Sequence, residues 1–292
     1  MIIDKLKDQK LINVPEWLPN NTVYLTYVGS TAYGASSDAS DLDCYGIVIP
    51  PKSCLFPHLD GEIYGFGSQK KRFEQYQQHH IQYEGKEYDF QIFNIVKFFN
   101  LAMDNNPSVI DTLYTPQECV IHLTHIGNMI RDNRNLFISK KCFHRFRGYA
   151  FSQMHKMKTK DASGKRAELR GKYGFDVKFA MHTVRLLCEC EQLLLKGEMD
   201  LRQDKELLKS IRRGEMSEDE IRTWASEKDK SLERLYESSK IPHSPKEKEI
   251  KELLVGCLEH HYGTLENALV VPDVYKSSLL EVRKILDRLG IQ

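Results

Sequence analysis

The first part of the chain carries short apolar segments of strand length, and polar turns separate them. Two neighbouring segments alternate apolar and polar residues, which is the period of a strand with one buried face. Glu84-Gly85 lies between these two segments and predicts a hairpin turn. The segments that predict strands are residues 23–28, 47–49, 79–83 and 86–93.

Beyond about residue 115 the pattern changes to the period of helices. Ser217, with Glu220 three residues later, fits the capping box that opens a helix. Thr115-Pro116 is a reasonable boundary between the two patterns. We therefore expect two domains: residues 1–115, which contain the strands, and residues 116–292, which are mainly helical.

Composition and charge set the broad class of the protein. The 292 residues include 41% apolar and 28% charged residues, and the formal net charge is +1, so composition alone predicts no polyanionic partner. No apolar run approaches the roughly twenty residues needed to span a bilayer, and the first residues do not resemble a signal peptide. We expect a cytoplasmic protein with no membrane partner.

Cysteines and histidines do not predict a disulfide framework or a structural zinc site. The seven cysteines are odd in number and form no Cys-x-x-Cys pair. Cys188 and Cys190 lie two residues apart on a predicted helix and are interpreted as small buried side chains. The adjacent pairs His79-His80 and His260-His261 are interpreted as surface histidines.

Candidate chemistry begins where the first predicted strand ends. Gly29 would let the backbone approach a phosphate closely, and Ser30 offers a main-chain N–H and a hydroxyl at the start of a helix. Asp41 and Asp43 follow on a second strand, where the period of two places both carboxylates on one face. Paired carboxylates of this kind suit Mg²⁺ or Mn²⁺. The alternative interpretation is a plain loop followed by a turn.

A third carboxylate is expected from the hairpin. Asp89 lies on the face of its predicted strand opposite to Tyr88 and Phe90. Glu87 shares the face of Asp89 and is the second choice, although a solvated strand charge is the simpler interpretation of Glu87.

Lys178, His182 and Arg185 are spaced i, i+4 and i+7 on a predicted helix and therefore share one face. Three donors in a row suit a triphosphate or an RNA backbone, and the alternative is a solvated basic face. His182 is also a candidate general acid.

A basic segment precedes this helix. Residues 140–172 contain eleven Lys or Arg residues, with Asp161 and Glu168 as the acidic ones. Aromatic residues interleaved with the charges either stack on bases or form the buried stripe of a helix. These aromatic residues are Phe143, Phe146, Tyr149 and Phe151.

These motifs together carry a family resemblance. Gly29-Ser30 followed by Asp41-Leu42-Asp43-Cys44 resembles the signature of the DNA polymerase β-like nucleotidyltransferase superfamily. Residues 106–114, Gly148-Tyr149-Ala150 and residues 172–187 are similar to one branch of it, the nucleotidyltransferases assigned to RNA-repair pathways of bacteria and large bacteriophages. The resemblance implies an α+β fold with a mixed sheet and helices packed on one side.

The resemblance also implies a reaction and a site. A nucleoside monophosphate would pass from an NTP, for which ATP is expected, to a hydroxyl acceptor, with pyrophosphate as the product. We rank an RNA 3′ end first as acceptor, with a protein hydroxyl or a small molecule as enzymatic alternatives and a catalytically inactive nucleotide- or RNA-binding module as the alternative of another class. A homo-oligomer is compatible with the helical half. Two Mg²⁺ or Mn²⁺ ions would be held by Asp41, Asp43 and Asp89, and the nucleotide by Gly29, Ser30, Lys172, Tyr173, Lys178, His182 and Arg185.

Overall fold

The centre of the molecule is a five-stranded sheet in the order β3-β4-β2-β1-β5. The computed structural model describes residues 1–36, 40–56, 72–159 and 165–263, with three short pairs near the C-terminus. β2 and β4 are parallel, and the other neighbouring pairs are antiparallel, so the sheet is mixed and the fold is α+β, as expected. The expected hairpin turn at Glu84-Gly85 joins β3 to β4. The strands are β1 (Thr22–Tyr27), β2 (Leu42–Val48), β3 (Gln75–Tyr83), β4 (Lys86–Asn94) and β5 (Val120–Leu123).

The two faces of the sheet bury different partners. In β2, Cys44 and Val48 belong to a cluster that includes residues of helix α1 (Ile2–Asp8). Ile47 belongs to the main core with the larger helices, and Asp43 lies on that same face because alternate residues of a strand point the same way. The strand period therefore directs Asp43 toward the helical part of the molecule.

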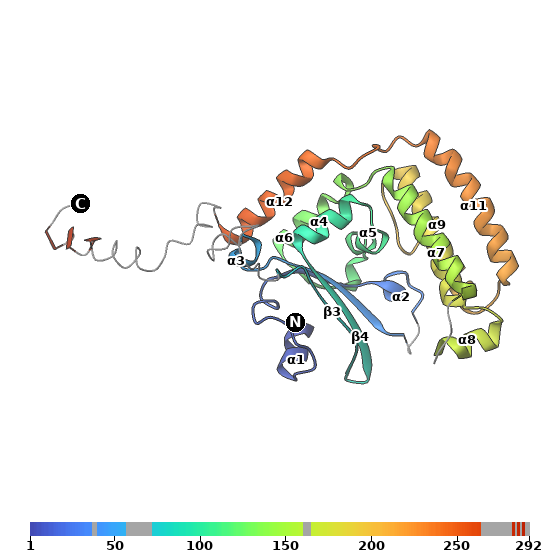
Figure 1. Cartoon of the computed structure of the whole chain (residues 1–292), viewed down its shortest axis with the longest axis horizontal. Coiled ribbons are helices and arrows are strands. Elements are labelled where there is room, and N and C mark those ends of the chain that lie inside the picture. The colour runs from blue at the N-terminus through green and yellow to red at the C-terminus, as the bar shows by residue number, and fades with distance from the viewer. Residues whose placement is uncertain are drawn as a thin grey trace.

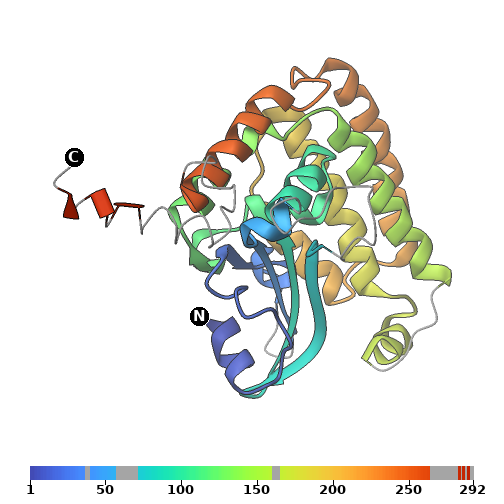
Figure 2. The ribbon, with the colours of Figure 1, turned by 60° about the vertical axis from the view of Figure 1, so that its left-hand side comes forward.

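Most helices pack on one face of the sheet, whereas α1 covers the opposite face (Figure 1). Beyond the helices nearest the sheet, α7, α9 and α11 pack side by side. A view turned by 60° shows the β3–β4 hairpin extending beside α1 (Figure 2). The remaining helices are α2 (Gly29–Ala32), α3 (Lys52–Leu55), α4 (Ile95–Met103), α5 (Pro107–Leu113), α6 (His125–Asp132), α7 (Lys141–Thr159), α8 (Lys165–Tyr173), α9 (Val177–Lys196), α10 (Lys205–Arg212), α11 (Glu218–Ser238) and α12 (Glu247–Tyr262).

Side-chain caps set the starts of the two longest helices. The carboxylate of Asp176 accepts hydrogen bonds from the N–H groups of Lys178 and Phe179, at 2.9 and 3.2 Å. This cap fixes Lys178 in the first turn of α9. The capping box expected at Ser217 and Glu220 opens α11 and is confirmed.

The main core includes residues from both sides of the expected boundary at Thr115-Pro116. β5 follows that boundary and still pairs with β1 in the sheet. The division into two domains stays a prediction, and the sheet and the helices share one hydrophobic core. Among the described residues, no helix combines the length and the apolar character needed to cross a bilayer. Cys188 and Cys190 are buried in α9, as expected.

Candidate active site

Gly29 shapes the turn after β1. Its φ of +62° lies in the left-handed region, which glycine adopts without strain. A Cβ atom at this position would lie 2.3 Å from Oδ2 of Asp43, so glycine is what allows the turn to approach this carboxylate. The N–H of Val28 donates to the backbone oxygen of Asp43 at 2.8 Å. α2 begins at Gly29, which places Ser30 at the start of a short helix, as expected.

Asp43 and Asp89 lie directly opposite each other on the parallel strands β2 and β4. Residues paired in this way point to the same face of a sheet, so both carboxylates project toward the helical part. Asp41 immediately precedes β2 and is half-buried. The pairing of β2 with β4 therefore brings Asp43 and Asp89 together, although they are far apart in sequence.

The three carboxylates offer the oxygen donors that a hard divalent cation takes. Burial raises the pKa of Asp43 to about 6, and the nearby charges of Asp89 and Asp41 add to this increase. The Lys178 ammonium opposes it. The raised pKa means that the residues around Asp43 do not fully balance its negative charge. Mg²⁺ and Mn²⁺ prefer ligand sets made of oxygen atoms. The residues present therefore fit the ions that the family resemblance implies.

Histidines of β3 contact the third carboxylate. The backbone N–H of His80 donates to Oδ1 of Asp89 at 2.8 Å, and the ring Nδ1 of His79 lies 3.1 Å from Oδ2 of Asp89. Nδ1 of His80 lies 2.5 Å from Oε1 of Glu87, and Oε2 of Glu87 accepts a hydrogen bond from Gln82. His80 is a surface residue, as expected, but the sequence does not predict that the histidine pair touches Asp89 and Glu87. Glu87 is hydrogen-bonded, not a freely solvated charge.

The start of α9 brings a cation to the carboxylates. Lys178 is exposed, and its charge acts on Asp43 strongly enough to oppose the rise in the pKa of Asp43. His182, one turn further along the helix, is half-buried. Lys178 is thus the one of the three expected α9 donors whose charge is felt at Asp43.

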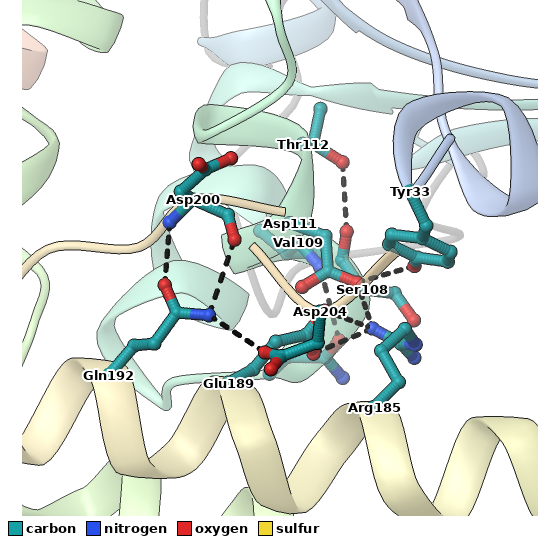
Figure 3. Close-up of polar contacts among 11 residues, drawn as sticks. Tyr33, Ser108, Val109, Asp111, Thr112, Arg185, Glu189, Gln192, Asp200 and Asp204 are labelled. Carbon is teal, nitrogen blue, oxygen red and sulfur yellow. Dashed lines mark hydrogen bonds and ion pairs between the residues drawn. The ribbon is translucent and has the colours of Figure 1, made fainter. Parts of the chain in front are cut away.

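Arg185 differs from the exposed phosphate ligand that the spacing predicts. Its side chain is 8% exposed, and its guanidinium binds carboxylates of the protein itself (Figure 3). Nη1 lies 2.6 Å from Oδ2 of Asp111 and 2.7 Å from Oε2 of Glu189. The guanidinium also lies 4.4 Å from the ring centroid of Tyr33, whose hydroxyl donates to Asp111. Because its guanidinium is buried and paired with Asp111 and Glu189, Arg185 is not available to bind a nucleotide phosphate.

The Arg185 network connects three elements around the site. Tyr33 follows α2, Asp111 lies in α5, and Arg185 and Glu189 lie in α9. Tyr33 is therefore held to the helix that carries Lys178. The network fixes the position of the turn at Gly29 relative to the helix that carries Lys178.

Lys172 and Tyr173 end α8. The Lys172 ammonium lies 4.8 Å from the centroid of the Tyr173 ring, and the ring packs against Gly214, where a Cβ atom would lie 2.2 Å away. This packing accounts for the aromatic side chain without a nucleotide. Their roles as nucleotide contacts stay predictions.

The aromatic residues of α7 divide into two groups. Phe143 and Phe146 are buried, as in the stripe of a helix, whereas Tyr149 and Phe151 are exposed. Tyr149 lines a cavity of about 340 Å³ on the exposed face of α7. The other lining residues are His144, Arg145, Gly148, Ser152, Gln153 and Lys156.

Tyr45 links this cavity to the carboxylates. It lies two residues after Asp43 on the same face of β2. Burial raises the pKa of Tyr45 to about 12, with further contributions from the nearby Asp43 and Tyr149. Asn106 donates to the hydroxyl of Tyr149 at 3.2 Å. Tyr149 of the α7 cavity therefore lies near enough to Tyr45 to affect the pKa of Tyr45.

Sequence reasoning missed the residues that support the site. Tyr33 and Glu189 stand in no motif, and Asp111 lies in the segment 106–114 without a predicted role of its own. The contacts of His79 and His80 depend on an irregular strand pairing. One signal was present, because acidic Glu189 lies four residues after Arg185 on the same helix.

The strand, the glycine turn and the paired carboxylates on a mixed sheet form the arrangement that the resemblance to polymerase β-like nucleotidyltransferases predicts. The chain belongs to the RNA repair pathway DNA polymerase beta family (RlaP), whose sequence model matches residues 3–256. The mixed sheet is consistent with membership of this polymerase β family.

Two further proteins are similar to the chain. An uncharacterized 38.9 kDa protein from the nrdC-mobD intergenic region of Enterobacteria phage T4 is 30% identical over 119 residues. The match covers 40% of this chain and 33% of the phage protein, so the chain spans about a third of that relative. A nucleotidyltransferase-like protein from Exiguobacterium sibiricum is 13% identical, with 92% of this chain and 86% of that chain covered and a TM-score of 0.28.

Proposed function

We propose that the chain transfers a nucleoside monophosphate from an NTP, preferably ATP, to the 3′ hydroxyl of an RNA and releases pyrophosphate. The observation that carries this proposal is the in-register pair Asp43 and Asp89, with the Gly29 turn against Asp43 and the Lys178 charge beside it. Family membership supports both the reaction and the RNA-repair setting.

Each part of the site has a role in this proposal. Two Mg²⁺ or Mn²⁺ ions, when bound, would supply charge neutralisation for the phosphates and activation of the attacking hydroxyl. Asp41 and Asp43 would hold both ions, and Asp89 would help to hold the one that activates the hydroxyl. Ser30 would donate to the triphosphate from the start of α2, and Lys178 would bind it from α9. His182 is the candidate donor of a proton to pyrophosphate.

The α7 cavity supports RNA as the acceptor. Its lining combines the exposed Tyr149, a ring on which a base can stack, with the cations Arg145 and Lys156. Arg145 is partly neutralised by Asp104, which leaves Lys156 as the cation at the other end of the cavity.

Labelled NTPs, an RNA pool and a cell lysate provide the test. We expect the RNA to gain label in Mg²⁺ or Mn²⁺, because its 3′ hydroxyl is the proposed acceptor. Asp43→Asn and Asp89→Asn should abolish labelling, whereas Glu87→Gln should retain it. Asp219→Asn, an exposed carboxylate of α11, is the matched control. Unchanged labelling in Asp43→Asn would refute the site.

A second arm of this experiment identifies the acceptor. Replacing Tyr149 and Lys156 together by Ala should weaken labelling of RNA and raise the RNA concentration needed for half-maximal rate, with ATP dependence unchanged. Label on a lysate protein or a small molecule, with none on RNA, would favour those acceptors. Nucleotide binding without turnover in every metal would favour the inactive binding module.

A further inference from the structure

Strand β3 is irregular where its histidines meet β4. The pairing register shifts between Gln78 and Ile81, and His80 has a φ of 59°. In a regular strand, adjacent side chains point to opposite faces. The irregularity instead lets His79 and His80 both contact carboxylates of β4, and such bulges commonly re-aim side chains beside active sites. A histidine in the left-handed region is also strained.

The result is a set of ligand atoms close enough to share one ion. His80, Glu87 and Asp89 each offer one donor atom, and these atoms lie within 4.8 Å of one another. Glu87 and Asp89 are two residues apart on one strand and therefore share a face. The side chain of His80 is 79% exposed, which leaves a path for an ion from solvent. His79, on the second oxygen of Asp89, is placed to orient that carboxylate.

The donor set differs in kind from that of Asp41 and Asp43. One imidazole with two carboxylates suits Zn²⁺ and the neighbouring divalent transition metals, whereas oxygen-only sets suit Mg²⁺. We propose that His80, Glu87 and Asp89 form a second metal site, selective for Zn²⁺ over Mg²⁺, which shares Asp89 with the candidate active site. An ion bound there holds the Asp89 carboxylate toward His80 of β3 and away from Asp43 of β2.

Sharing Asp89 gives this site a regulatory consequence, and this part rests on the proposed function. Asp89 cannot serve the Zn²⁺ site and complete the catalytic set at the same time if each use needs its own orientation of the carboxylate. Zn²⁺ at His80 should therefore lower nucleotidyl transfer even when Mg²⁺ is in excess.

Direct Zn²⁺ binding tests the site without any nucleotide or acceptor. The full chain, freed of metal by chelation, is titrated with ZnCl₂ in excess Mg²⁺ by calorimetry. We expect one Zn²⁺ per chain, with affinity reduced at least about tenfold in both His80→Ala and Glu87→Gln. His243→Ala, an exposed histidine between α11 and α12, is the matched control and should keep the affinity of the original chain. Circular dichroism verifies that each variant is folded.

Two outcomes would overturn the site. One is equal Zn²⁺ affinity in His80→Ala and His243→Ala. The other is Zn²⁺ binding that Asp41→Asn abolishes and His80→Ala leaves intact, which would place the ion at the oxygen-only set. Either result would stand whether or not the chain transfers nucleotides, so it is distinct from failure of the proposed function.

The regulatory part has its own readout. In the labelling assay with Mg²⁺, Zn²⁺ should inhibit the original chain, and His80→Ala should require at least about tenfold more Zn²⁺ for the same inhibition. Equal inhibition of both proteins, or none in the original chain, would overturn competition for Asp89.

Discussion

Asp43 carries an unfavourable charge in the isolated chain. It is half-buried, its neighbours include two further carboxylates, and its pKa rises to about 6. Gly29 is what brings the backbone of the turn against this group. A buried carboxylate with a raised pKa of this kind lowers the stability of the folded chain at neutral pH. Substitution of Gly29 would have two effects: backbone strain at its positive φ, and displacement of the Asp43 carboxylate by the new Cβ atom.

Gly29→Ala should impair the site beyond its effect on backbone strain. The left-handed backbone costs about 1–2 kcal/mol for alanine, and the new Cβ atom would displace the Asp43 carboxylate. A shift of about 1 Å in a reacting group can lower the rate about 100-fold. We expect a loss of that order in the labelling assay, together with lower stability in urea.

Gly85→Ala is the matched control for this variant. Gly85 also has a positive φ, +75°, but a Cβ atom there would have no neighbour within 4 Å. It should lose a similar amount of stability and retain transfer. Equal activity of the two variants would show that Gly29 does not position Asp43.

At the scale of elements, α9 shows what helical spacing can and cannot predict. Lys178 and Arg185 share a face by spacing, yet Lys178 is exposed and Arg185 is buried. The period of a helix defines the direction of each side chain around the axis. The period does not predict which turns of the helix are covered by other elements and which are exposed to solvent. Here the end of α9 that carries Lys178 is open, whereas Arg185 lies beneath Tyr33 and Asp111.

The buried network on α9 should make stability depend on pH. Burial raises the pKa of Glu189 to about 8, against the opposing charge of Arg185. The folded chain therefore keeps a proton that the unfolded chain releases above about pH 4.5. The free energy of unfolding should fall as pH rises toward 8, by at most about 1.4 kcal/mol per pH unit from this group.

Glu189→Gln removes this titration and keeps an oxygen that can accept from Arg185. Urea unfolding between pH 5.5 and 8.5 should give the variant a flatter dependence than the original chain. Its stability relative to the original chain should increase toward high pH. Parallel curves for the two proteins would contradict the assignment of the proton to this network.

At the scale of the whole molecule, the helical part holds the turn that precedes Asp41. Arg202 donates to the backbone oxygen of Ala32 at 3.2 Å, and Arg212 donates to that of Ala35. Arg185 reaches the same stretch through Tyr33. Because these cations lie after the expected domain boundary, the catalytic half depends on the helical half for its geometry.

Residues 1–115 alone should fail to fold cooperatively. This fragment lacks β5 and leaves the buried face of the sheet without α6, α7 and α9. Urea unfolding of the fragment, followed by circular dichroism, should show no sigmoidal transition, whereas the full chain should show one. A cooperative transition with a dispersed amide NMR spectrum would establish residues 1–115 as an independent domain.

The sequence predicted much of the fold, and local periodicity explains why. The hairpin at Glu84-Gly85 and the faces of Asp43 and Asp89 follow from a period of two, which neighbouring residues express. The register of β2 against β4 and the bulge at His80 involve segments distant in sequence or a departure from that period. Burial of Arg185 depends likewise on packing between α5 and α9.

The parallel pairing of β2 with β4 also determines when the site can form during folding. Both the β1–β2 and the β3–β4 pairs join neighbouring strands of the chain, whereas β2 reaches β4 only past β3. Contacts between distant segments form late because a long loop must close first. The mutual repulsion of Asp43 and Asp89 therefore arises only after the β1–β2 and β3–β4 pairs have formed.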